Sequence, residues 1–408
     1  IVYTEQNRAA AEKLADCAPL ISLDEAVMHE PDPALLHARR EEILDIDPVY
    51  VLFTSGSTGV PKGVAACHRS VLDYTESLCE AIGFSEDTVF ANQTPLYFDA
   101  PLKEIMPTLK YGATTYLVPK MLFSFPIPLC AFLNRHKVNT VCWVVSALTM
   151  ISAFGVLDSH PPRYLTTVCF GSEVFPRPQY DRWRAALPDA RFFNLYGPTE
   201  ATGMSCWWHA DRALAPDEPI PVGRPFRNTD ILLLAEGTHG ARRITPDEPD
   251  TEGEICMRGT CVTLGYYNDP ARTAAAFVQN PLQSAYPEII YRTGDIGRYN
   301  AHGELVFVGR RDAQIKILGH RVELGEIEAA AAPAVRAACC VYDGARTRLV
   351  LYYTADESVT PDGLRAMLNQ RLPRYMMPAL LIRLDALPLT PNGKIDRRAL
   401  TEAAKATD

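Results

Sequence analysis

The chain has 408 residues, of which 47% are hydrophobic and 22% are charged, and these ordinary fractions exclude a disordered or fibrous protein. Forty Lys and Arg residues against 49 Asp and Glu residues give a net charge of −9. That balance argues against a nucleic-acid partner, because such proteins usually carry a basic surface. The longest apolar run, residues 142–157, is interrupted by Ser and Thr and is too short to span a bilayer, so we expect no membrane span.

The eleven cysteines are scattered along the chain and form no C-x-x-C pair. Cysteines with this spacing and no neighbouring His ligand do not favour a zinc site. We expect them to be reduced thiols of a cytoplasmic protein, since disulfides are rare in that compartment.

The first half of the chain alternates between two kinds of segment. Runs rich in Val, Thr and aromatic residues predict buried strands, and runs with a helical spacing of apolar residues predict helices. The expected strands are 49–54, 114–118, 138–145 and 165–170, and the expected helices are 68–82, 127–136, 147–154 and 179–187. This alternation is typical of a parallel sheet covered by helices, so we expect an α/β fold.

The second half of the chain changes character twice. From about residue 216 to residue 309, short strand-like runs separated by turn signals predict a β-rich subdomain that completes a large body, residues 1–309. We expect a hinge at 310–313. Beyond it, 314–408 has the size of a small, mobile α+β domain. Its expected helices are 323–332 and 361–371, and its expected strands are 337–341 and 348–353.

A segment rich in glycine and hydroxyl groups, 54–63, lies at the end of the first expected strand. Its three glycines leave backbone N–H groups accessible, and its four hydroxyls add side-chain donors. A loop of this kind after a strand can surround polyphosphate oxygens, and its lysine adds positive charge. Its spacing does not fit a Walker A loop. The expected phosphate-binding residues are Thr54, Ser55, Gly56, Ser57, Thr58, Gly59 and Lys62.

Two further segments provide the remaining parts of a nucleotide site. In 194–200, Tyr196 offers an aromatic face for a base, Thr199 a hydroxyl for phosphate, and Glu200 a carboxylate ligand for Mg²⁺. Farther along, Asp295 follows a turn and can accept hydrogen bonds from both hydroxyls of a ribose. Together with the phosphate loop, these segments predict ATP binding.

These segments resemble the motifs of the adenylate-forming superfamily, and most closely those of the amino-acid adenylation domains of nonribosomal peptide synthetases. The resemblance follows the family's order over nearly the whole chain, and its further motifs are 98–100, 253–259, 265–267, 309–316, 319–328, 372–378 and 392–396. Family members normally begin well upstream of the phosphate loop, whereas 53 residues precede it here. We therefore expect the front subdomain to be missing.

The resemblance implies a two-step reaction. A carboxylate attacks the α-phosphate of ATP–Mg²⁺ and releases pyrophosphate, and the phosphopantetheine thiol of a carrier protein then takes the acyl group from the adenylate. By resemblance, Lys394 is the catalytic cation, acting with Thr199 and Glu200, and Asp312 is the hinge residue that lets the small domain close. The resemblance also assigns adenine and ribose contacts to Asn194, Tyr196, Gly197, Asp295 and Arg310, and puts Lys316 and Gly319 in the segment that faces the thiol.

Asp99 lies where amino-acid-activating members hold the α-ammonium group of the substrate. Fatty-acid and acetate ligases of the superfamily lack this acid, so Asp99 favours an amino acid. If Lys103 points inward, it needs an anion and favours an acidic amino acid. If its ammonium extends outward beside Glu104, we expect a small neutral amino acid such as alanine. The other pocket residues implied by the resemblance are Ala100, Cys142, Val168, Phe170, Leu195, Gly203 and Met204, with Lys394 closing the pocket.

Three other functions remain open at this point. A stand-alone D-alanine–carrier protein ligase shares the fold and the Asp99 position. An acyl- or aryl-CoA ligase shares the fold, but Asp99 argues against it. For an inactive ATP-binding module, loss of motif residues gives no support, because Lys62, Glu200, Asp295 and Lys394 are all present. Only the expected absence of the front subdomain keeps this alternative open.

Overall fold

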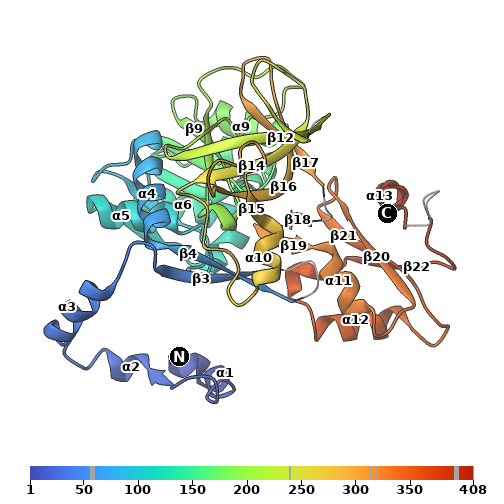
Figure 1. The fold of residues 1–408 in the computed structure, drawn as a ribbon, viewed down its shortest axis with the longest axis horizontal. Helices are drawn as coiled ribbons and strands as arrows, with labels where there is room; N and C mark the ends of the chain where they lie inside the picture. Colours follow the sequence, from blue (N-terminus) through green and yellow to red (C-terminus); the bar gives the residue numbers. More distant parts are fainter. Residues whose placement is uncertain (56–59, 239, 312–313, 318, 390–394, 408) are drawn as a thin grey trace. The chain divides into compact units, whose positions relative to one another are not determined.

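The computed structural model describes residues 1–55, 60–238, 240–311, 314–317, 319–389 and 395–407. The chain separates into two compact units, Ile1–Asp47 and Pro48–Asp408, and each is described by itself. Figure 1 shows the first unit in dark blue and the second from blue to red.

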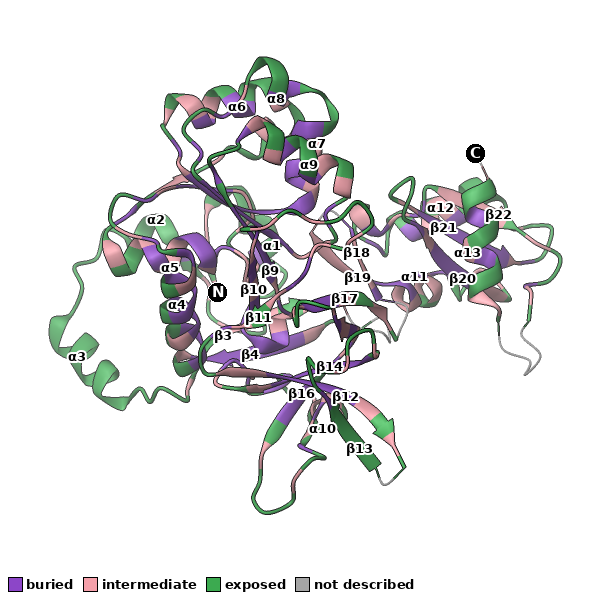
Figure 2. Cartoon of the chain, turned by 90° about the horizontal axis from the view of Figure 1, so that it is seen from above, coloured by how far each residue is buried: buried purple, intermediate pink, exposed green. Residues whose placement is uncertain are grey.

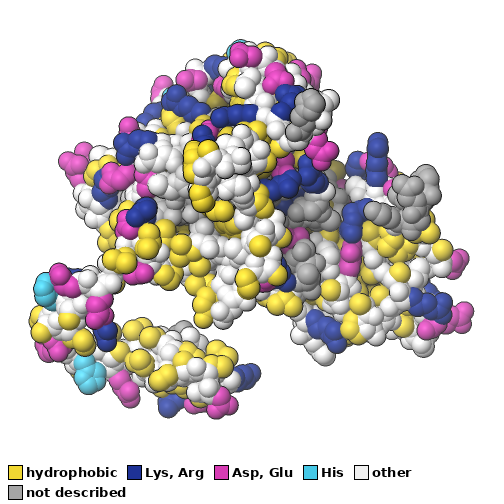
Figure 3. Space-filling model, viewed as in Figure 1, with side chains coloured by type: hydrophobic (Ala, Val, Ile, Leu, Met, Phe, Trp, Pro, Cys, Tyr) yellow, Lys and Arg dark blue, Asp and Glu magenta, His cyan; other side chains and the backbone are white. Residues whose placement is uncertain are grey.

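The first unit contains little regular structure. Two short strands pair in parallel, and three short helices accompany them: β1 (Val2–Tyr3), β2 (Ile21–Ser22), α1 (Arg8–Glu12), α2 (Leu23–Ala26) and α3 (Pro33–Glu42). Helix α3 begins after Asp32, whose carboxylate accepts hydrogen bonds from two backbone N–H groups of the first turn. Within residues 1–47, all of which the structure describes, only Ala11 and Ser22 are buried. The many hydrophobic side chains on the surface of this unit are visible in Figure 3.

The second unit is built on a seven-stranded sheet within the described residues. Five strands run in parallel in the order β6-β5-β7-β8-β9, and two antiparallel strands, β10 and β11, extend the β9 edge. The expected alternation of strands and helices is confirmed. The strands are β5 (Val89–Asn92), β6 (Thr114–Leu117), β7 (Thr140–Val144), β8 (Thr167–Gly171), β9 (Arg191–Tyr196), β10 (Cys206–His209) and β11 (Arg224–Pro225). The helices are α4 (His68–Ile82), α5 (Leu102–Tyr111), α6 (Pro126–Arg135), α7 (Val145–Ala153), α8 (Val156–Ser159) and α9 (Arg177–Ala186).

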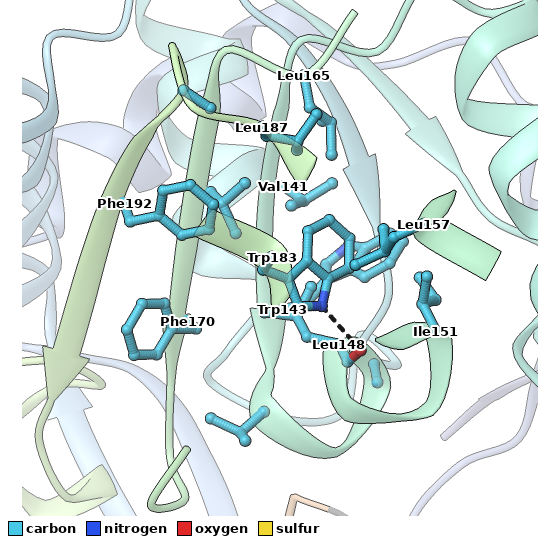
Figure 4. Packing of buried hydrophobic residues seen from close by; sticks show 14 of the residues in the cluster. Val141, Trp143, Leu148, Ile151, Leu157, Leu165, Phe170, Trp183, Leu187 and Phe192 are labelled. Carbon is cyan, nitrogen blue, oxygen red and sulfur yellow. Dashed lines mark hydrogen bonds between the residues drawn. The ribbon is translucent and has the colours of Figure 1, made fainter. Parts of the chain in front are cut away.

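Both faces of this sheet are covered, as a parallel sheet requires. On one face, the strands pack against α6, α7, α8 and α9 in an entirely apolar cluster. Figure 4 shows its aromatic centre, where Trp183 donates a hydrogen bond of 3.0 Å from Nε1 to the carbonyl oxygen of Leu148. On the other face, the strands pack against α4, which supplies Tyr74 and Leu78, and against residues around α5. Figure 2 shows the central strands in purple, the colour of buried residues.

The first expected strand differs from the prediction. Strand β3 (Pro48–Thr54) does not join the parallel sheet but pairs in antiparallel fashion with β4 (Lys62–Cys67). Only 55–61 connects the two strands, and a parallel crossover needs a dozen or more residues. The pair instead bridges, through Val64, to Tyr266 in the segment before residue 270, and Val64 also packs with Phe277 and Tyr291 of the second sheet.

The second sheet is the β-rich part of the chain. Within the described residues its strands are antiparallel and follow the order β13-β12-β14-β16-β15, with β17 also pairing with β16. The bounds are β12 (Thr229–Gly237), β13 (Gly240–Ile244), β14 (Gly253–Gly259), β15 (Phe277–Gln279), β16 (Ile289–Tyr299) and β17 (Leu305–Arg310), and helix α10 (Pro270–Ala276) precedes β15.

The C-terminal part begins with a hairpin, β18 (Gln314–Ile317) and β19 (His320–Glu323). A three-stranded sheet follows, in which β21 pairs with β20 in antiparallel fashion and with β22 in parallel. The two expected helices and two expected strands are present, whereas the sequence interpretation missed β22 and α13. The bounds are α11 (Leu324–Ala331), β20 (Ala337–Asp343), β21 (Arg348–Thr354), α12 (Pro361–Asn369), β22 (Leu380–Arg383) and α13 (Arg397–Ala406). The domain boundary at 310–313 stays a prediction. Among the described helices, none has the length and apolar character needed to cross a membrane.

Candidate active site

The phosphate loop connects β3 to β4, so its two ends are fixed by a strand pair. Thr54 ends β3 directly opposite Lys62, the first residue of β4. The hydroxyl of Ser55 donates a hydrogen bond of 2.8 Å to the backbone carbonyl of Arg321. Four of the predicted phosphate-binding residues, Gly56, Ser57, Thr58 and Gly59, lie outside the described residues.

Glu200, the predicted metal ligand, is fully buried at 0% exposure in the short helical turn Thr199–Ala201. Its Oε1 lies 3.1 Å from Nζ of Lys62, and it accepts a hydrogen bond of 2.8 Å from the hydroxyl of Tyr266. The structure therefore brings the loop lysine and the predicted metal ligand together. Burial lowers the pKa of Lys62, although the charge of Glu200 opposes that shift.

The principal partner of Glu200 is a residue that the sequence interpretation missed. Arg321, on β19, donates from one guanidinium nitrogen to both carboxylate oxygens, at 2.9 and 2.7 Å. Burial alone would raise the pKa of Glu200, but Arg321 and Lys62 outweigh it and hold this pKa well below its ordinary value. One signal was available in the sequence. In a hairpin at 314–323, Lys316 pairs with Arg321, and like charges opposite each other are unfavourable unless acids face them.

A second acid and its partners form the predicted ribose site. Asp295 on β16 lies opposite Arg310 on β17, and the two side chains form an ion pair. The other carboxylate oxygen of Asp295 accepts a hydrogen bond of 2.5 Å from the hydroxyl of Tyr196. Burial, followed by the charge of Asp295, raises the pKa of Tyr196. The structure thus brings these three predicted residues together.

Two other residues of the predicted adenine site have structural roles. The side-chain amide of Asn194 is buried and donates a hydrogen bond of 2.8 Å to the carbonyl oxygen of Pro221. Gly197 lies so close to the chain after Glu200 that a Cβ there would be 2.6 Å from the backbone of Gly203. This close approach requires glycine and holds the two ends of the turn together. Thr199 is half-buried at the start of that turn.

The predicted substrate acid lies at the start of α5. Asp99 and Ala100 are half-buried, whereas Lys103 and Glu104, the second and third residues of α5, are 4% and 1% exposed. The outward orientation considered for Lys103, with its ammonium in solvent, is therefore not adopted. Glu104 accepts a hydrogen bond of 3.3 Å from the side-chain amide of Asn92. Burial raises the pKa of Glu104 to about 8, and the charge of Lys103 opposes this shift.

The remaining pocket residues divide between the two faces of the seven-stranded sheet. Cys142, Leu195 and Met204 pack with Tyr74 on the α4 and α5 face, and a Cβ at Gly203 would lie 3.8 Å from the Tyr74 ring. The charges of Glu104 and Lys103 both act on the Cys142 thiol, whose pKa is raised chiefly by burial. These residues form one group around the start of α5.

The expectation is not met for Val168 and Phe170. Both side chains belong to the apolar cluster on the opposite face, and Figure 4 shows Phe170 among its aromatic residues. Successive side chains of a strand point to opposite faces, so residues of β8 that flank Cys169 must point away from it. Cys169 pairs in register with Cys142 and shares its cluster, so Cys169 takes the place expected for its neighbours.

The hairpin β18–β19 connects the two acidic parts of the site. Burial lowers the pKa of Lys316, although the charges of Asp295 and Asp99 oppose this shift. At the hairpin turn, the N–H of Gly319 donates to Glu173 at 2.8 Å, and a Cβ at Gly319 would lie 2.9 Å from the Val144 side chain. Both predicted thiol-facing residues thus belong to a hairpin that contacts the site. Lys394 and Asp312 lie outside the described residues.

Comparison with known proteins identifies the family. The model of the AMP-binding enzyme family matches residues 3–267, and the chain therefore belongs to that family. Its resemblance to adenylation domains is confirmed by a linear gramicidin synthase protein from Brevibacillus parabrevis, which is 36% identical over 86% of this chain. The L-proline–[L-prolyl-carrier protein] ligase of Streptomyces coelicolor is 34% identical over 87% of this chain.

A solved structure shows the same fold. The chain superposes on an NRPS protein containing adenylation and PCP domains, bound to a vinylsulfonamide inhibitor, with a TM-score of 0.76 and 28% identity. That match covers 97% of this chain and 68% of the solved chain. The chain spans 4% of the gramicidin synthase protein and 66% of the proline ligase.

Proposed function

We propose that this chain activates an amino acid with ATP as an aminoacyl-adenylate and then transfers the aminoacyl group to the phosphopantetheine thiol of a carrier protein. In the first step, a carboxylate oxygen of the amino acid forms a bond to the α-phosphorus while the bond to pyrophosphate breaks. In the second, the thiolate sulfur bonds to the acyl carbon and AMP leaves. The curated relatives named above support this proposal, because one belongs to a gramicidin synthase and the other is a carrier-protein ligase.

One observation carries the proposal. Asp295, the candidate ribose acid, accepts a hydrogen bond from Tyr196 and pairs with Arg310. The charges of Asp295 and of Asp99, the candidate ammonium acid, both act on Lys316. An aminoacyl-adenylate carries ribose hydroxyls at one end and an α-ammonium at the other. Two acids whose charges act on one half-buried side chain suit those two ends.

The charges of the site suit the first step. In-line attack increases negative charge at the α-phosphate, so a fixed cation there stabilises the transition state more than the ground state. Lys62 lies at the end of the phosphate loop and is positioned for the phosphate groups of ATP. By resemblance, we assign the cation at the α-phosphate to Lys394.

The kind of substrate side chain that the pocket accepts depends on which anion pairs with Lys103. A buried ammonium needs an anion, and the adjacent Glu104 is one candidate. If the charge of Glu104 is sufficient, the pocket suits a small neutral side chain. If the substrate supplies the anion, the pocket suits an acidic one. Cys142, Cys169 and Met204 restrict either kind of side chain to a compact shape.

Adenylate-forming enzymes use ATP, generally with Mg²⁺. In the arrangement of this site, the residues do not fit a magnesium ion. Both oxygens of Glu200 already accept hydrogen bonds from Arg321, and Oε1 has two further partners, Tyr266 and Lys62. We therefore derive no part of the reaction from a metal at this carboxylate. We also propose a cytoplasmic location, which the many buried thiols support.

The decisive experiment is amino-acid-dependent exchange between ATP and pyrophosphate, measured on the purified chain with every proteinogenic amino acid and with D-alanine. We expect one strong signal. A signal from glutamate or aspartate would assign the counter-ion of Lys103 to the substrate, and a signal from alanine would assign it to Glu104. A preference for D-alanine would favour the cell-wall type of ligase. No exchange with any amino acid, under conditions where ATP binds, would contradict the proposal.

A second experiment tests the role assigned to Lys394. Lys394→Ala should nearly abolish the exchange reaction while ATP binding stays close to that of the wild type. Lys405→Ala is the matched control, because Lys405 is exposed on α13. Unchanged exchange in Lys394→Ala would disprove the role of this lysine without affecting the proposed reaction.

A further inference from the structure

The hydroxyl group of Tyr266 lies between an acid and a cation of the candidate site. It donates a hydrogen bond of 2.8 Å to Oε1 of Glu200 and accepts one of 3.2 Å from Nζ of Lys62. A tyrosine hydroxyl can do both at once, because it has one hydrogen to donate and lone pairs that accept. The ammonium of Lys62 also lies 4.9 Å from the centre of the Tyr266 ring, close enough for a cation–π contact. Tyr266 therefore holds Lys62 by two separate contacts.

The backbone around Tyr266 is paired with strand β4, the strand that begins at Lys62. Val64 of that strand forms a bridge with Tyr266. The N–H of Tyr267 donates a hydrogen bond of 2.7 Å to the carbonyl oxygen of Gly63. Tyr266 and Lys62 are 204 positions apart in the sequence, but these backbone contacts place them side by side.

The ring of Tyr266 is fixed by packing as well. Tyr266 is 8% exposed and shares a small apolar cluster with Val64, Phe277 and Tyr291. The rings of Tyr266 and Phe277 meet edge to face, with 5.5 Å between their centroids. The N–H of Tyr266 donates a hydrogen bond of 3.0 Å to the hydroxyl of Thr273. Removing the hydroxyl alone should therefore leave the ring and the backbone in place.

The contacts of Lys62 leave it able to bind a ligand. A lysine ammonium has three N–H donors. In the described part of the chain, Lys62 pairs with Glu200 and with Tyr266, so these contacts account for two donors and leave the third for a phosphate oxygen. A lysine side chain loses much rotational freedom when it is ordered, and ordering it before the ligand arrives removes that loss from binding.

We propose that Tyr266 is a positioning residue that holds the ammonium of Lys62 in place for the phosphate groups of ATP. The inference rests on the proposed function, because that function brings ATP to the phosphate loop. The hydroxyl acts on Lys62 directly and also through Glu200, whose carboxylate it orients. Its removal should weaken the binding of a nucleotide with phosphates, whereas the binding of a nucleoside without phosphates should not change.

The test compares ATP with adenosine in calorimetric titrations of the purified chain. Tyr266→Phe should reduce the affinity for ATP about tenfold, the scale of one hydrogen bond to a charged group, and change the affinity for adenosine less than about twofold. Tyr353→Phe is the matched control, because it removes a hydroxyl from a fully buried tyrosine of β21, and it should match the wild type with both ligands. An unchanged affinity for ATP, or an equal loss for ATP and adenosine, would overturn the inference.

A double-mutant cycle shows whether the hydroxyl acts through Lys62. In the background of Lys62→Met, the further change Tyr266→Phe should leave the affinity for ATP unchanged, because the group that the hydroxyl positions is then absent. A second loss of about the same factor in that background would mean that the hydroxyl acts on another group, and it would contradict the proposal.

A measurement that keeps the hydroxyl completes the test. A fluorinated tyrosine in place of Tyr266 reports the surroundings of the ring by fluorine NMR. Its resonance should shift when ATP is added but not when adenosine is added, and Lys62→Met should abolish the shift at saturating ATP. Absence of a shift with ATP would overturn the inference even if Tyr266→Phe failed to fold. Because all these experiments measure binding, absence of ATP–pyrophosphate exchange would contradict the proposed function alone.

Discussion

The two faces of the seven-stranded sheet are built on the same strands but contain different kinds of groups. The face covered by α7 and α9 holds Trp143, Trp183 and Phe170 in an apolar cluster. The face covered by α4 and α5 also has an apolar cluster, but Lys103 and Glu104 are buried beside it. Successive side chains of a strand point to opposite faces of the sheet. A shift of one position along the strand therefore moves a side chain from one of these environments to the other.

This difference shows which face of the sheet can hold buried ionisable groups. Apolar packing on one face fixes the strands, and those fixed strands can then keep ionisable groups out of water on the other face. Burying such groups is unfavourable and needs a scaffold whose stability comes from elsewhere. Substitutions on the α7 and α9 face should therefore affect folding, and substitutions on the α4 and α5 face should affect catalysis and pH dependence.

The largest effect on stability is expected from Trp183→Ala. Trp183 is fully buried, and truncating a buried aromatic residue typically reduces the free energy of unfolding by about 3–5 kcal/mol. Phe154→Ala, at an exposed position just after α7, should change it by less than about 0.5 kcal/mol. Urea denaturation measures both. Comparable losses in the two variants would contradict the packing of this face.

The largest effect on activity is expected from Asp99→Ala. Leaving the substrate ammonium without its acid should cost about 3–5 kcal/mol, which corresponds to a loss of about a hundredfold or more in kcat/KM for every amino acid activated. The unfolding free energy should hardly change. The control is Asp87→Ala, because Asp87 is exposed before β5. A loss confined to one amino acid would mean that Asp99 contacts the substrate side chain rather than its ammonium.

Glu104 should give the protein an unusual dependence of stability on pH. Burial raises its pKa to about 8, whereas a glutamate in an unfolded chain titrates near about 4.3. The folded state therefore holds the proton more tightly, so the favourable contribution is complete at low pH and is lost as the pH rises towards 8. The unfolding free energy should fall between pH 5 and pH 8 in the wild type. In Glu104→Gln this fall should be smaller by on the order of 2–4 kcal/mol.

Glu86, which is exposed in the segment before β5, provides the control for this experiment. Glu86→Gln should leave the pH profile of the unfolding free energy like that of the wild type. If the wild type and Glu104→Gln had parallel profiles between pH 5 and pH 8, then Glu104 would be ionised in the folded protein throughout that range, and Lys103 would already have its counter-ion.

The smallest effect is expected at Val168 and Cys169, two neighbouring residues of β8 whose side chains lie on opposite faces of the sheet. Cys169→Ala enlarges the space among the side chains beside Lys103 and should change the ratio of kcat/KM between two amino acids of different size by a few-fold. Val168→Ala should leave that ratio unchanged but reduce the unfolding free energy by roughly 1–3 kcal/mol. If Val168→Ala changed the kcat/KM ratio and Cys169→Ala changed only the unfolding free energy, Val168 would line the substrate pocket instead of Cys169.

Local patterns predicted most of the fold. The predicted strands and helices between β6 and α9 lie within a few residues of their expected ranges, because their apolar spacing and their position on a buried sheet agree. Strand β5 and helices α5 and α8 were not predicted. The pairing of β3 could not be read from its composition, since Val, Leu and Phe suit a parallel strand and a hairpin equally well. The short connection to β4 was the informative feature. Helix α13 was signalled by Asp396, whose carboxylate accepts from the N–H of Ala399.

The sequence allowed prediction of those site residues that lie within the family motifs. Asp295, Arg310 and Tyr196 meet as expected because each lies at a position that the family motifs fix. Arg321 was missed because its importance depends on a contact across 121 positions in sequence. The face occupied by Val168 was missed for a different reason, since motif spacing identifies a strand but does not show which of its residues point towards α5.

The first unit has a thermodynamic consequence of its own. Ordering each residue of a chain costs roughly 1–2 kcal/mol, and burial of apolar surface is what usually offsets it. Residues 1–47 bury only two side chains, while Val27 and Met28 are 69% and 83% exposed. Local opening of this segment should therefore require far less free energy than opening of the central sheet. A protease should cut first within these residues and leave Pro48–Asp408 as a resistant fragment.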